Sequence, residues 1–167
     1  ASLLELEVQA HDDPRERLTR LRRIADQRQR QLGDPDGAFD AHARAARVAL
    51  AEPELDDHLA ALERLAGARE KTAELVALYR ELAPSILDAD LQRRLYLDIA
   101  DRARGKLGDV DLAREFYRRV LDANPEDDRA LVALEKLYRE TGEHEPLREI
   151  LLRKAELKAD DVDERRA

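Results

Sequence analysis

The residues of this chain that could do chemistry are mainly arginines, and they are concentrated in one segment. Residues 14–32 contain seven arginines. At about 100° per residue, Arg23 and Arg30 fall opposite the apolar stripe of the segment, with Arg20 and Arg22 beside them. Guanidinium groups donate forked, charge-assisted hydrogen bonds to carboxylates. The segment therefore predicts a docking surface for an acidic peptide. The alternative is a solvated helix face whose arginines pair with neighbouring acids.

The same basic surface could continue on later segments with an equivalent pattern. The residues that would extend it are Arg64, Arg102, Lys106, Lys136 and Arg139.

Residues suited to catalysis or metal binding are few. The chain has no cysteine, and its two serines, Ser2 and Ser85, stand outside any Gly-x-Ser-x-Gly motif. The four histidines are not spaced i, i+3 or i, i+4 as zinc ligands on one helix would be; they are His11, His42, His58 and His144. We therefore expect no enzyme, no cofactor and no metal site.

Composition narrows the classes of partner. The 167 residues include 30 Lys+Arg and 38 Asp+Glu, which gives a net charge of −8. This acidic balance argues against a nucleic-acid partner. No apolar run approaches the roughly 18 residues of a membrane span, so we expect no membrane insertion. The start of the chain carries no leader signal, which favours the cytoplasm.

Proline, glycine and apolar spacing together predict an all-α fold. Several prolines precede apolar-periodic runs, and Gly33, Gly108 and Gly142 close such runs as helix-ending glycines do. About eight main helices are expected, near 14–32, 36–51, 55–67, 71–83, 89–106, 110–123, 127–140 and 145–159. A short helix near 2–10 and a stub from about 161 would flank them.

An internal repeat organises these helices. Segment 24–26 recurs at an offset of 75 as segment 99–101, whereas Pro53 recurs at an offset of 72 as Pro125. The change of offset predicts three extra residues around 39–46, most simply one added helical turn. The whole chain, 1–167, would then be one domain. Its repeat units would span about 12–87 and 88–159, with 1–11 and 160–167 as edges of neighbouring units.

The repeat resembles a known family. The residues that carry the resemblance are Leu107-Gly108-Asp109, Ala113, Tyr117 and Pro125, followed by Leu131, Leu134, Tyr138 and Gly142. In this order and spacing they are similar to tetratricopeptide repeats, with turn anchors at Gly33, Glu70, Gly108 and Gly142. The helices that end at Gly33 and Gly108 carry one extra residue before the turn. The resemblance implies an α-solenoid of stacked antiparallel hairpins, a right-handed superhelix that binds other proteins.

The repeat also predicts which side chains fill the core between hairpins. The expected layer-filling residues are Leu21, Leu32, Leu65, Ile99, Leu107, Leu134 and Leu137. The four tyrosines, at 79, 96, 117 and 138, should pack between helices with their hydroxyls at a wet edge. Phe116 is expected to be exposed and to serve as a contact point.

Three functions fit this sequence. The first is a non-enzymatic interaction scaffold that binds a peptide or a partner domain, which could be acidic. The second is a structural spacer in a longer repeat protein, and the third is a docking domain of a larger enzyme. Apolar edges at the ends of such an array could also support end-to-end self-association.

Overall fold

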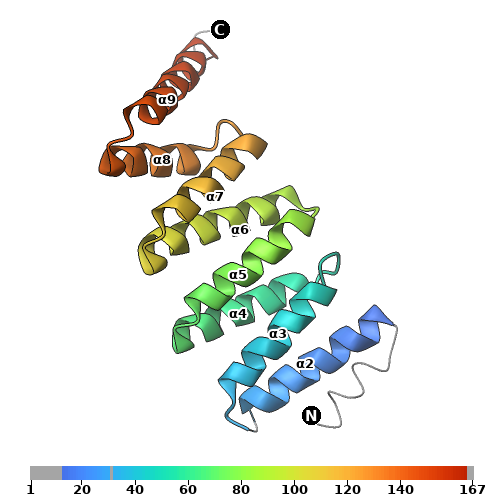
Figure 1. The fold of residues 1–167 in the computed structure, drawn as a ribbon. Coiled ribbons are helices and arrows are strands. Elements are labelled where there is room, and N and C mark those ends of the chain that lie inside the picture. The colour runs from blue at the N-terminus through green and yellow to red at the C-terminus, as the bar shows by residue number, and fades with distance from the viewer. Residues whose placement is uncertain (1–12, 31, 165–167) are drawn as a thin grey trace. The chain divides into compact units, whose positions relative to one another are not determined.

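The computed structural model describes residues 13–30 and 32–164, with side chains as far as residue 159 (Figure 1). This part of the chain is all-α and contains no strand, which confirms the predicted all-α class and the number of main helices. The expected helix near 2–10 lies outside the described residues. The α-helices are α2 (Pro14–Arg30), α3 (Pro35–Val48), α4 (Leu55–Arg69), α5 (Thr72–Leu82), α6 (Ala89–Arg102), α7 (Val110–Ala123), α8 (Asp128–Thr141) and α9 (His144–Glu164).

The chain divides into two compact units, and the division falls inside α6. Unit 1 is Ala1–Gln92 and unit 2 is Arg93–Ala167. In unit 1, α2 packs on α3, α3 on α4 and α4 on α5; in unit 2, α7 packs on α8 and α8 on α9. Each unit is therefore built from helices that contact their neighbours in sequence.

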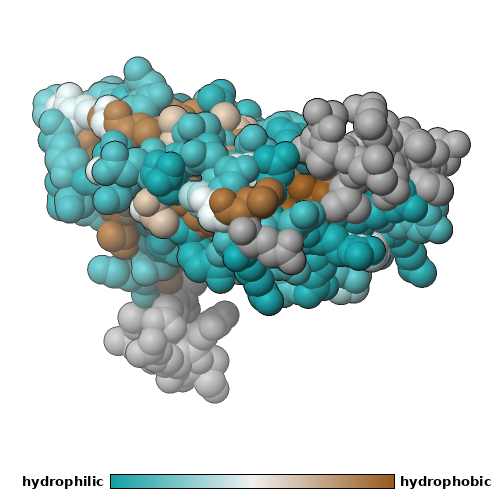
Figure 2. All heavy atoms as spheres, turned by 90° about the horizontal axis from the view of Figure 1, so that it is seen from below, coloured by the Kyte–Doolittle hydropathy of each residue, from teal (hydrophilic) through white to brown (hydrophobic). Residues whose placement is uncertain are grey.

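Each unit has a core of leucines, alanines and tyrosines. Five of the seven expected layer-filling residues are buried: Leu21, Leu65, Ile99, Leu134 and Leu137. The prediction was wrong for Leu32 and Leu107, which are 64% and 39% exposed. On the face drawn in Figure 2, hydrophilic residues cover most of the coloured surface, and hydrophobic residues appear as small patches between them.

The two exposed leucines follow from the extra residue before the turn. Leu107 ends a short π-helix, Ala103–Leu107. The backbone N–H of Leu32 likewise donates to the carbonyl oxygen of Gln27, five residues earlier, at 3.2 Å. A wider turn holds one more residue than an α-turn, so the last leucine rotates out of the apolar stripe.

All four expected anchors adopt the left-handed conformation. The φ angles are 58° at Gly33, 56° at Glu70, 67° at Gly108 and 72° at Gly142. Glycine reaches this region without a steric penalty, whereas Glu70 is the one non-glycine residue in the described part of the chain with a positive φ. The turn positions therefore recur even where the glycine does not.

The extra residues lie elsewhere than expected. Helices α3 and α7 both have 14 residues, so α3 has no added turn. Instead, α3 and α4 are joined by residues 49–54, whereas α7 and α8 are joined by residues 124–127. The connection is two residues longer, and α4 is one residue longer than α8, which together account for the three extra residues. A surface loop accepts an insertion at lower cost than a packed helix.

The end of the described chain also differs from the expectation. Helix α9 runs unbroken to Glu164, although a separate stub was expected from about 161. Residues 155–164 contain neither proline nor glycine, so nothing in the local sequence stops the helix.

Candidate functional site

The predicted basic residues of unit 1 are mostly uncommitted. Arg22, Arg23, Arg30 and Arg64 are exposed, and none of them forms an ion pair with a described residue. Arg20 differs because its guanidinium lies 3.7 Å from the Glu16 carboxylate, one turn earlier on α2. Four of the five predicted cations of this unit are thus without an ion-pair partner in the described part of the chain.

The predicted basic residues of unit 2 are divided between paired and unpaired. Arg102 pairs with Asp98 at 2.6 Å, and Arg139 pairs with Glu135 at 2.7 Å, each within its own helix. Lys106 and Lys136 are exposed and form no ion pair with the described residues. This set resembles the solvated helix face that was the alternative interpretation.

Two of the unit 1 cations, on different helices, act on the same buried ring. Arg22 on α2 and Arg64 on α4 both act electrostatically on the buried His42 ring. Arg22 also lines an open hollow of about 390 Å³ that includes Thr19 on α2, Glu52 in the loop 49–54 and His58 on α4. We call the exposed surface around Arg22 and Arg64 the α2–α4 face.

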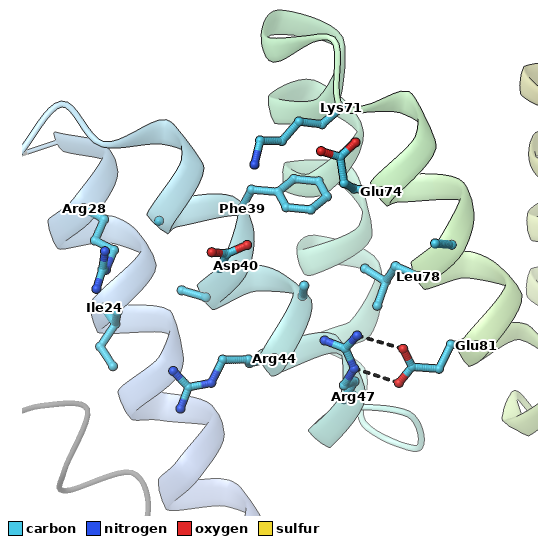
Figure 3. A pocket seen from close by; sticks show the side chains of 14 residues that line it. Ile24, Arg28, Phe39, Asp40, Arg44, Arg47, Lys71, Glu74, Leu78 and Glu81 are labelled. Carbon is cyan, nitrogen blue, oxygen red and sulfur yellow. Dashed lines mark hydrogen bonds and ion pairs between the residues drawn. The ribbon is translucent and has the colours of Figure 1, made fainter. Parts of the chain in front are cut away.

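A larger groove lies on the α3 and α5 side of unit 1 (Figure 3). It has a volume of about 630 Å³, and residues of α2, α3 and α5 line it. Arg47 donates two hydrogen bonds of 2.7 Å to Glu81 at one end. At the other end, the Lys71 ammonium lies 5.1 Å from the Phe39 ring centroid and 3.3 Å from Asp36. Because side chains of both signs line this groove and several of them are paired internally, it presents no single sign to a ligand.

Each hairpin places an acid on its first helix seven residues before the left-handed anchor. The Tyr79 hydroxyl donates to Glu63 at 3.1 Å, and the Tyr117 hydroxyl donates to Asp101 at 2.5 Å. In the first hairpin the equivalent acid is Asp26, which acts electrostatically on His42. Burial raises the pKa of Tyr117 strongly, and its hydrogen bond to Asp101 raises it further. This recurring contact ties the two helices of a hairpin together.

The aromatic residues are structural. All four tyrosines are buried, which confirms their expected packing. Phe116 is also buried, 5.5 Å from Tyr96 between ring centroids, so the prediction that it is an exposed contact point was wrong. Its burial follows from its place on the inner face of α7, one residue before Tyr117.

Sequence reasoning missed one buried polar contact. The Nδ1 atoms of His42 on α3 and His58 on α4 lie 3.0 Å apart, and the two side chains are 9% and 2% exposed. Burial lowers the pKa of His42 to about 4, helped by His58, Arg64 and Arg22. Burial also lowers the pKa of His58, and the positive charge of Arg22 lowers it further. The residues stand sixteen positions apart on different helices, so no spacing rule within one helix could have paired them.

The described residues hold no group of three or more histidines and carboxylates placed to bind a metal ion. No helix among them is long and apolar enough to cross a membrane. No protein-family model matches the chain, and a comparison with curated proteins finds none that is significantly similar. The described chain is therefore all-α, with consecutively packed helices and with exposed cations in unit 1 that pair with no described residue.

Proposed function

We propose that this chain is a non-enzymatic protein-interaction module, a TPR-like α-solenoid whose α2–α4 face binds an acidic segment of a partner protein. The observation that carries the proposal is the absence of ion pairs at Arg22 and Arg64 within the described chain, although acids outnumber bases overall. In an acidic chain, neighbouring carboxylates would readily pair with these arginines if their role were only structural.

The chemistry of the face fits a carboxylate ligand. Arginine presents several N–H donors in one plane, so it can hold a carboxylate through two hydrogen bonds. Two helices contribute cations to the face, and the hollow beside Arg22 offers room for a side chain. Several such contacts on rigid helices favour partners with a matching charge pattern and increase the association rate. They contribute less to the affinity itself.

A charge-reversal experiment tests this proposal. Arg22→Glu combined with Arg64→Glu should abolish retention of acidic partners in a pull-down whose retained proteins are sequenced by mass spectrometry. Each reversed contact should weaken binding by about 2 kcal/mol or more. The matched control is Arg80→Glu with Lys158→Glu, which changes the net charge equally at two exposed cations outside the predicted set. Circular dichroism checks that both variants stay folded.

The alternatives give different results. Loss of the partner in both variants would point to non-specific charge attraction, and retention in both would place the binding site elsewhere. If the folded parent chain retains no partner at low salt, the structural spacer becomes the better description.

A further inference from the structure

Unit 1 buries two histidines where unit 2 buries groups that do not titrate near neutral pH. Helices α3 and α7 begin 75 residues apart and bury equivalent positions, so His42 corresponds to Tyr117. The buried residues of α4 and α8 match at an offset of 72, so His58 corresponds to Ala130. The chain thus contains its own titrating and non-titrating versions of one packing site.

The two imidazoles contact each other directly. Their Nδ1 atoms are 3.0 Å apart, and their ring centroids are 5.3 Å apart with the planes tilted by 52°. When both rings are neutral, one Nδ1–H donates to the lone pair of the other. The Nε2 atom of His58 is buried and has no hydrogen-bond partner within the described chain.

We propose that the His42–His58 contact is an acid-sensitive joint between α3 and α4, which loosens unit 1 as the pH falls. The effect of this loosening on binding, the loss of the α2–α4 face in acid, rests on the proposed function. The acid sensitivity of the His42–His58 contact does not depend on that function.

Protonation acts on the contact in two steps. A first proton gives one cationic ring, which can still donate to the neutral ring. A second proton places two N–H groups against each other across 3.0 Å, so the hydrogen bond is lost and like charges repel. A protonated His58 would also bury an Nε2–H without an acceptor. Unfolded histidines bear none of these costs.

Charged groups from three sides act on the pair. On α2, Arg22 opposes protonation and Asp26 favours it; on α4, Arg64 opposes it and Asp57 favours it. Glu54, at the end of the loop 49–54, also favours the charged form of His58. Burial outweighs these carboxylates, so the pKa of both rings is lowered, that of His42 to about 4.

The sign of the pH effect follows from linkage. The native pKa of His42 lies below the unfolded value of 6.5, so the stabilisation is complete above that value and is lost as the pH falls toward 4. With these two pKa values, His42 alone raises the equilibrium constant for unfolding of unit 1 about twentyfold as the pH falls from about 7 to about 5. His58 adds to this in the same direction.

The test compares the two units in one sample. Urea unfolding is followed by the amide NMR signals of unit 1 and unit 2 separately, at about pH 7 and about pH 5. The matched variant is His42→Tyr with His58→Ala, which transfers the unit 2 residues to unit 1 and sets a hydroxyl near Asp26. Unit 1 of the parent should lose stability in acid by at least the twentyfold factor, and the variant should not.

Equal acid sensitivity in the two units, or an acid-sensitive variant, would overturn the proposal. If the variant does not fold, a pH titration of the parent chain, followed by the NMR signals of the ring Cε1–H protons, replaces it. A titration midpoint for His42 near 6.5 would also overturn the proposal. A second variant, Arg22→Gln, leaves the core intact and removes a charge that opposes protonation, so it should reduce the acid sensitivity of unit 1. No partner is present in these experiments, so their outcome is independent of the proposed function.

Discussion

Glu70 occupies a backbone conformation that costs most residues free energy. Glu70 ends α4 with a φ of 56°, in the left-handed region. The other three turns have glycine at this position. The steric cost for a residue with a Cβ is about 1–2 kcal/mol. The rest of unit 1 therefore has to hold this turn in place.

Glu70→Gly should stabilise unit 1 by about 0.5–1 kcal/mol, because relief of the left-handed strain exceeds the added entropy of the unfolded chain. Urea unfolding at neutral pH measures the change. The control is Gly142→Ala, where φ is 72° and an added Cβ would meet no atom within 4 Å. It should destabilise unit 2 by about 1 kcal/mol. An unchanged midpoint for Glu70→Gly would show that the turn carries no strain.

Single residues also mark where prediction from the sequence ends. The spacing of the turns located the left-handed position at Glu70, although its residue type gave no sign of it. The His42–His58 pair could not be found in this way, because it depends on which faces of α3 and α4 meet. Leu32 and Leu107 were misplaced for a similar reason, since a one-residue change of helical pitch alters a side chain's direction.

At the level of helices, the strongest local determinants are aspartates at the helix starts. Asp34, Asp109 and Asp127 accept a backbone hydrogen bond from the residue three positions later. Asp127 is the most buried of them and also pairs with Arg93 on α6. Burial alone would raise its pKa, but the hydrogen bonds from Arg93 and from the Ala130 N–H lower the pKa overall.

Asp127→Ala should destabilise unit 2 by about 2 kcal/mol, because α8 loses its cap and Arg93 loses a carboxylate. Asp127→Asn keeps the cap and should cost only about 1 kcal/mol. Urea unfolding of both variants, followed through unit 2 signals, measures the difference. Because the native pKa of Asp127 lies below 3.8, this stabilisation is present above that pH and is lost in stronger acid. Equal effects of the two substitutions would exclude a capping role.

The helices themselves were largely predictable, and the connections were not. Proline, aspartate and glycine act within one turn, so the starts of α3, α7 and α8 follow from nearby residues. The three-residue insertion was assigned to the wrong element because the change of offset was placed around 39–46, inside α3. Burial patterns place the change of offset in the loop 49–54 instead.

At the level of the whole molecule, α9 presents neighbouring apolar side chains to solvent. Leu151 and Leu152 are 40% and 53% exposed. Adjacent exposed leucines promote association between chains. We therefore predict that the expected end-to-end self-association uses this surface.

Leu151→Lys combined with Leu152→Lys should lower any concentration-dependent association, measured by sedimentation velocity over a range of protein concentrations. Both positions are partly solvated, so the stability of unit 2 should fall by less than about 1 kcal/mol. Val132→Lys, at an exposed position on α8, is the control. Association that persists in the double variant would place the contact elsewhere.

The wide turns before Gly33 and Gly108 also define the length of the repeating unit. The first hairpin of each pair has the extra residue before its turn, and the second hairpin, which turns at Glu70 or Gly142, lacks it. The repeating unit is therefore a pair of hairpins that differ from each other, and a shortened or lengthened array should keep these pairs whole.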